Sequence, residues 1–143
     1  MLPQRAARTY SQIGVETGVA DANPHGLIFM LYDGAKQAIA EAGTHLAAGR
    51  IADKGRAMSR AIAIIDEGLK GSLDPASGDI AAQLSQLYDY MCRRLLLASL
   101  RNDRAGLDEV SSLLDELRGA WAKIDPNAAS AVLPAASKVL APA

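Results

Sequence analysis

Four segments of this chain repeat apolar residues at intervals of three or four, and this spacing restricts the fold more than any other feature. A period near 3.6 residues places such side chains along one face of an α-helix. The segments lie between residues 23 and 125 and are separated by short breaks that contain Gly, Asp, Asn or Pro. Helices with one apolar face each and short connections pack side by side in alternating directions. We therefore predict an all-α protein, an antiparallel four-helix bundle.

Local sequence signals mark the ends of the first two predicted helices. Asn23 can cap the first helix, and Pro24 suits its first helical position because the missing N–H would have no partner there. Gly49 ends this helix. The second helix begins at Ile51 and is interrupted at Gly71 and by the Asp-Pro pair at residues 74 and 75.

The last two predicted helices are marked in the same way. Ser77 is expected to cap the third helix, with Asp79 favourably placed in its first turn. Asn102 marks its end and Asp103 caps the fourth helix, which the Asp-Pro pair at residues 125 and 126 ends. The predicted core positions of the four helices, in order, are Leu27, Leu31, Ala35, Ala38, Ala42 and Leu46; Ile51, Gly55, Met58, Ile62, Ile65 and Leu69; Ile80, Leu84, Leu87, Met91, Leu95 and Ala98; and Leu107, Val110, Leu114, Leu117, Trp121 and Ile124.

The chain divides into three parts. Residues 1–22 form an N-terminal arm, residues 23–125 the bundle, and residues 126–143 an Ala-, Pro- and Ser-rich tail. The tail contains three prolines, so a long regular helix is not expected there.

Composition restricts the possible partners and the compartment. The 143 residues carry a formal net charge of −1, which gives no long-range attraction to nucleic acid or to an anionic membrane. A single cysteine, Cys92, allows no intrachain disulfide. The N-terminus lacks the apolar stretch of a secretory signal, and no apolar run approaches the ~20 residues that cross a bilayer. These features predict a cytoplasmic protein that does not insert into membranes.

The sequence offers little for catalysis. Glu41 and His45 share a helix face, but a di-iron bundle also needs Glu-x-x-His pairs and inward carboxylates, which are missing. A phosphotransfer histidine would be exposed and followed by Lys and Gly, whereas His45 has no such lysine and lies near the core face. His25, His45 and Cys92 are therefore interpreted as structural. We expect no enzyme activity, no metal and no cofactor.

Apolar residues away from the core face indicate binding surfaces. With Met91 pointing inward, the helical phase of about 100° per residue turns Leu96, Leu97 and Leu100 outward, next to Arg93. Three outward leucines are typical of a surface that a partner or another part of the chain covers.

The second predicted helix suggests a related surface. Ala57, Ala61, Ile64, Gly68 and Gly71 are assigned to its outward side, where small residues would leave a channel with Ile64 as an anchor. Both surfaces suit a partner that binds as an amphipathic helix.

Several short stretches, in this order and spacing, give the chain a family likeness. It resembles the flagellar secretion chaperone FliS family along roughly residues 10–124. The stretches that carry the resemblance are Tyr10–Thr17, Asn23–Ile28, Met30–Ala35, Leu87–Met91, Arg93–Leu95 and Leu100–Asp103.

The resemblance implies an antiparallel helical bundle that binds the disordered C-terminal segment of flagellin and so prevents flagellin from polymerising prematurely. The bundle would then deliver flagellin to a membrane export component of the FlhA type. It also implies that the N-terminal arm can lie over part of the flagellin groove, here through Tyr10 and Ile13. Two other hypotheses stay open on the residues alone: a general helical adaptor that uses the outward leucines for another partner, and a phosphotransfer protein that uses His45.

Overall fold

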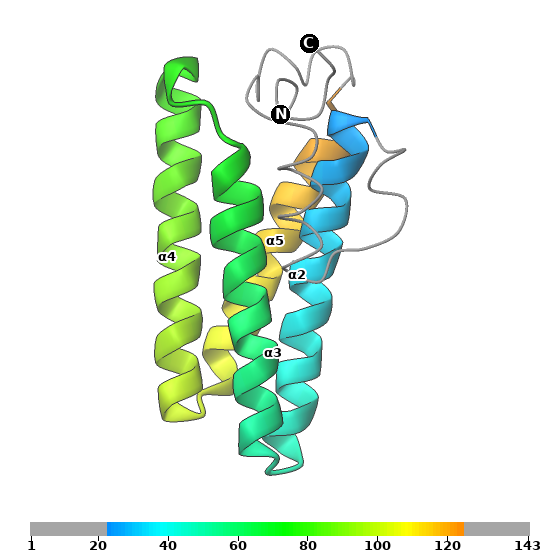
Figure 1. The fold of residues 1–143 in the computed structure, drawn as a ribbon, viewed down its shortest axis with the longest axis vertical. Helices are drawn as coiled ribbons and strands as arrows, with labels where there is room; N and C mark the ends of the chain where they lie inside the picture. Colours follow the sequence, from blue (N-terminus) through cyan, green and yellow to red (C-terminus); the bar gives the residue numbers. More distant parts are fainter. Residues whose placement is uncertain (1–22, 125–143) are drawn as a thin grey trace.

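The computed structural model describes residues 23–124, which form a bundle of four α-helices without any strand (Figure 1). The helices are α2 (Pro24–Ala47), α3 (Ile51–Ala63), α4 (Asp79–Arg101) and α5 (Arg104–Ala122). Successive helices pack against each other, and α5 returns to contact α2, so the four surround one core. The predicted all-α fold is confirmed. The predicted arm, with Tyr10 and Ile13, and the whole predicted tail lie outside the described residues.

The predicted signals at three helix ends are confirmed. The side-chain oxygen of Asn23 accepts a hydrogen bond from the backbone N–H of Gly26 at 2.7 Å. The side chain of Asp103 likewise accepts from Ala105 at 3.0 Å, which caps α5. Asn102 takes the left-handed conformation that ends α4, with φ of 52°. These short-range bonds satisfy backbone groups that a helix end leaves without an internal partner.

The predicted cap of the third helix is wrong. Asp74 caps a short 3₁₀ turn, η3 (Pro75–Ser77), so Ser77 belongs to that turn and not to the start of α4. Gly78 occupies the cap position with φ of 82°, a conformation that glycine adopts at little cost, and α4 begins at Asp79. The Ser77 hydroxyl is buried and has no hydrogen-bond partner among the described residues.

The connection from α3 to α4 is longer and less regular than predicted. The helix continues from Ala63 into a π-helical turn, η1 (Ile64–Leu69), and a 3₁₀ turn, η2 (Lys70–Ser72). The buried Ser72 hydroxyl donates to the carbonyl of Gly68 at 2.6 Å, which supports this change of winding.

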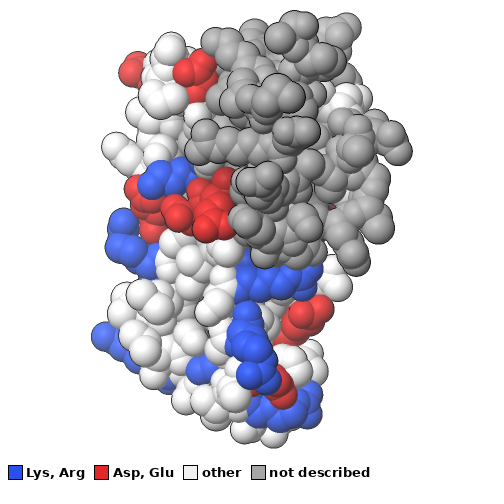
Figure 2. All heavy atoms as spheres, viewed as in Figure 1, with Lys and Arg blue, Asp and Glu red and all other residues white. Residues whose placement is uncertain are grey.

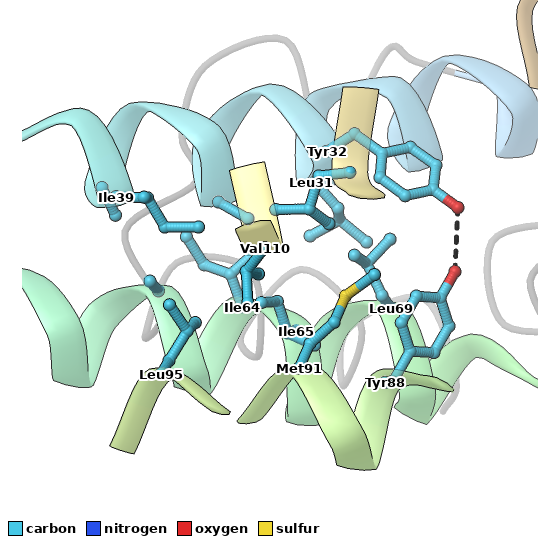
Figure 3. Packing of buried hydrophobic residues seen from close by; sticks show 14 of the residues in the cluster. Leu31, Tyr32, Ile39, Ile64, Ile65, Leu69, Tyr88, Met91, Leu95 and Val110 are labelled. Carbon is cyan, nitrogen blue, oxygen red and sulfur yellow. Dashed lines mark hydrogen bonds between the residues drawn. The ribbon is translucent and has the colours of Figure 1, made fainter. Parts of the chain in front are cut away.

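Large aliphatic side chains from all four helices fill the core. Figure 3 shows Leu31 and Ile39 of α2 facing Met91 and Leu95 of α4, with Val110 of α5 between the layers. Most predicted core positions are buried. Two of them, Ile51 and Ile80, stand in the first turns of α3 and α4 and are exposed.

The predicted outward channel on the second helix is also wrong. Ala57, Ala61, Ile64 and Gly68 are buried, and only Gly71 is exposed. At a rotation of about 100° per residue, the side chains of the first four point only about 60–120° away from the direction of Met58 around the helix axis. Because α3 packs against both α2 and α4, it buries these flanks as well as the face of Met58. Their small side chains form part of the core.

Candidate functional site

Helix α4 carries exposed leucines on its outer side near its C-terminal end. Leu96, Leu97 and Leu100 are 53%, 42% and 72% exposed, whereas Leu95, which directly precedes Leu96 in the sequence, is fully buried. We refer to Leu96, Leu97 and Leu100 as the outer leucine patch. The prediction that these three side chains point away from the core is confirmed.

Arginines gather around the same end of α4, and part of the group is engaged in the fold. Arg94 binds Glu109 at 2.8 Å and Asp103 at 3.5 Å, which ties α4 to α5 across their turn. Arg93 is exposed on the side of α4 that carries the outer leucine patch. Figure 2 shows most of the visible basic side chains in the half of the bundle that holds the α4–α5 and α2–α3 turns, with acidic side chains both among them and toward the opposite end.

A second apolar surface lies near the opposite end of α4, between α4, α5 and the start of α2. A cavity of about 340 Å³ opens there to solvent. We call it the α4–α5 groove, and its lining residues are Tyr32, Ile80, Gln83, Leu84, Leu87, Leu117, Ala120, Trp121 and Ile124. The groove could not be predicted from the sequence because Leu84, Leu87 and Leu117 have the spacing of core residues, whereas in the structure they are only half-buried.

A pair of tyrosines closes the groove toward the core. The hydroxyl oxygens of Tyr32 and Tyr88 lie 2.8 Å apart and both side chains are buried (Figure 3). Burial raises the pKa of both phenols above their usual value, since an ionised phenolate would lose its hydration. The two hydroxyls therefore stay protonated and satisfy each other.

His25 and Trp121 hold the start of α2 to the end of α5 beside the groove. Nε2 of His25 donates to the carbonyl of Trp121 at 2.9 Å, and Nε1 of Trp121 donates to the carbonyl of His25 at the same distance. The two rings stack with centroids 4.9 Å apart. These contacts agree with the interpretation of His25 as a structural residue, and they fix the position of the one tryptophan that lines the groove.

The other residues considered for chemistry are held by ordinary structural contacts. Nδ1 of His45 accepts a hydrogen bond from Nε of Arg50 at 3.0 Å. Cys92 is half-buried, and its burial, together with the charges of Asp66 and Asp89, raises the pKa of the thiol to about 11. A thiol with such a pKa is a poor nucleophile near neutral pH. Within residues 23–124, no three His, Cys, Asp or Glu side chains gather in a way that could hold a metal ion.

None of the helices between residues 23 and 124 combines the length and the apolar character that crossing a bilayer requires.

A known protein family and several of its members are similar in sequence to this chain. The family described as Flagellar protein FliS matches residues 6–128. The flagellar secretion chaperone FliS of Salmonella typhimurium is 50% identical over 122 residues, which cover 85% of this chain and 90% of that protein. The FliS of Escherichia coli is 41% identical over 122 residues, with 85% and 90% covered. The chaperone FliSB of Pseudomonas aeruginosa is 40% identical over 122 residues, with 85% and 96% covered.

Proposed function

Because the chain belongs to the FliS family, we propose that it is a cytoplasmic flagellar secretion chaperone that binds the C-terminal segment of flagellin. By holding this segment, the bundle prevents flagellin from polymerising before export. The loaded chaperone then delivers flagellin to an export-gate component of the FlhA type. No chemical step is part of this function.

The observation that supports the proposal is the outer leucine patch. Apolar side chains this exposed favour association with a partner that removes them from water. The patch stands on a regular helix, so a client can lay the apolar face of its own helix against it. Arg93 beside the patch adds a positive charge that can orient the client.

Energetics require the client to contact more than the patch. Ordering a disordered segment costs on the order of 1–2 kcal/mol per residue, and burial of apolar surface returns about 25 cal/mol per Å². A segment of a few dozen residues must therefore bury on the order of a thousand Å² or more. We propose that the segment also enters the α4–α5 groove, which lies on the other side of the same helix from the patch.

Calorimetric titration tests the proposal directly. The purified chain is titrated with full-length flagellin and with flagellin that lacks its C-terminal segment. We expect tight binding of the first with a large negative heat-capacity change, and loss of binding with the second. If neither protein binds, the proposed function is wrong.

Two variants test the surface. Leu96→Asp and Leu100→Asp each place a charge in the outer leucine patch and should weaken flagellin binding while circular dichroism and thermal unfolding stay unchanged. Ala52→Asp is the matched control, since Ala52 is exposed in the first turn of α3, where an acidic residue is favourable. Unchanged affinity in both leucine variants would show that flagellin binds elsewhere on the bundle.

A further inference from the structure

The α4–α5 groove reaches the end of the described chain. Ile124, the last described residue, lines the groove, and residues 125–143 follow it directly. Whatever the conformation of that segment, its first residue is attached at the mouth of the groove. The segment therefore has an effective concentration at the groove in the millimolar range, as is usual for a short flexible linker.

The polar groups of the groove are almost all satisfied. The hydroxyl of Tyr32 is engaged with Tyr88, and Nε1 of Trp121 donates to the carbonyl of His25. Among the described side chains that line the groove, only the amide of Gln83 is polar and has no such hydrogen bond within the bundle. An occupant of this groove should accordingly be apolar and uncharged, because a buried charge would find no partner.

The segment after Ile124 has this character between its two charged residues, Asp125 and Lys138, whereas the segment before the bundle carries charges along its length. Residues 126–137 contain no charged side chain and carry the adjacent apolar pair Val132 and Leu133. Residues 1–22, by contrast, include Arg5, Arg8, Glu16 and Asp21. Pro126 and Pro134 also lack a backbone N–H, which reduces the number of donors that burial would leave unpaired.

The distances allow the contact. Val132 is eight residues beyond Ile124, and a chain reaches at most about 3.3 Å per residue, or about 26 Å here. The groove side of α4 between Ile80 and Leu87 is only about 10 Å long at the helical rise of 1.5 Å per residue. The linker can therefore turn back and place Val132 and Leu133 among Leu84, Leu87 and Leu117 without strain.

We propose that Val132 and Leu133 dock into the α4–α5 groove of their own chain. The contact covers the apolar groove in the free protein. Where the proposed function holds, a client that uses the same groove must displace this segment, and its apparent affinity falls by the fraction of molecules in which the groove is open. The docking itself does not depend on the identity of the client.

A spin label in the C-terminal segment of the full-length chain tests the docking. In a Cys92→Ser background, Ser137→Cys provides the attachment site, and the methyl NMR signals of the bundle are recorded with the label oxidised and reduced. Serine at position 92 can still donate to the nearby carbonyl of Ile62, now 3.8 Å from the thiol. We expect strong broadening at Leu84, Leu87 and Leu117, independent of protein concentration, and little at Leu100.

Substitutions in the groove and in the docking segment test whether docking in the groove causes the broadening. Ile80→Asp puts a charge at the edge of the groove, at a position 54% exposed in the first turn, where the fold tolerates an acidic residue. Leu133→Asp changes the docked segment itself. Each should reduce the broadening at least several-fold, whereas Leu100→Asp at the other end of α4 should leave it unchanged. Broadening that is absent in the parent chain, or that persists in both groove variants, would overturn the proposal.

Addition of flagellin separates this inference from the proposed function. Loss of the broadening when flagellin binds supports a shared groove. Broadening that persists beside bound flagellin would overturn the displacement, while leaving both the docking and the chaperone function in place. Broadening in a chain that binds no flagellin would support the docking and contradict the proposed function.

Discussion

The two ends of the α4–α5 pair differ in how closely the helices approach. Near their turn, α4 and α5 are so close that a Cβ at Gly106 would lie 2.5 Å from the Cβ of Ala98. At the other end they diverge (Figure 1), and the α4–α5 groove opens between them. The same two helices thus form a closed end and an open end.

Polar contacts follow the same division. At the closed end, Lys54 is only 4% exposed, and its ammonium donates to the carbonyl of Ser99 and the side chain of Asn102 at 2.7 and 2.8 Å. This joins α3 to the α4–α5 turn and places a cation at the C-terminal end of α4, where the helix dipole favours it. At the open end, the Tyr32 and Tyr88 hydroxyls pair across the core. A bundle can thus fix its helices at one end and leave apolar surface accessible at the other.

The closed end should be most sensitive to Gly106→Ala. The added methyl group would collide with Ala98 and with the guanidinium of Arg94, so the helices must separate or shift. We expect a loss of about 3 kcal/mol in the free energy of unfolding, measured by urea denaturation. Gly119→Ala on the same helix is the control: nothing lies within 4 Å of a Cβ there, and alanine should add up to about 1 kcal/mol. Equal effects of the two substitutions would contradict the close approach.

Lys54→Met should have the next largest effect. It keeps the aliphatic part of the side chain and removes the donor, which leaves the carbonyl of Ser99 and the side chain of Asn102 without this partner. We expect a loss of about 2 kcal/mol in urea denaturation. Arg56→Met, on the exposed side of the same helix, should cost less than about 1 kcal/mol. A near-zero effect at Lys54 would show that the buried ammonium does not stabilise the turn.

At the open end, the tyrosine pair can be tested by a double-mutant cycle. Tyr88→Phe leaves the buried hydroxyl of Tyr32 without its partner, and we expect a loss of about 1 kcal/mol. The double variant with Tyr32→Phe should recover part of that loss, because no unpaired hydroxyl remains. Additive losses in thermal unfolding would contradict a direct interaction between the two hydroxyls.

The smallest effect concerns Cys92, halfway along α4. Its pKa in the folded chain is raised to about 11, whereas an unfolded thiol titrates near 8.5. Between these values the unfolded chain loses a proton that the folded chain keeps, so this group lowers stability as pH rises from about 8.5 to 11. Alkylation by iodoacetamide, followed by mass spectrometry, should be more than ten-fold slower at pH 8 in the folded chain than in urea. Equal rates would show that the thiol is not protected.

The local features of the fold could be predicted from the sequence because they depend on neighbouring residues. Asn23 and Asp103 cap helices through bonds to residues two or three positions away, and the period of the leucines on α4 separates Leu95 from Leu96 and Leu97. Ser77 was misassigned because Gly78 could take a positive φ and start α4 one residue later than a serine cap would.

The sequence by itself determined four amphipathic helices, their order, and the outward direction of the outer leucine patch, since these follow from the chemistry of a single helix. Only the tertiary structure decided how wide a face each helix buries. It enclosed Ala57, Ala61 and Ile64 between two neighbouring helices, and it left Leu84, Leu87 and Leu117 half-buried where α4 and α5 diverge. A helical period gives the direction of a side chain, but burial depends on the distance to the next helix, and contacts such as that between Gly106 and Ala98 fix this distance.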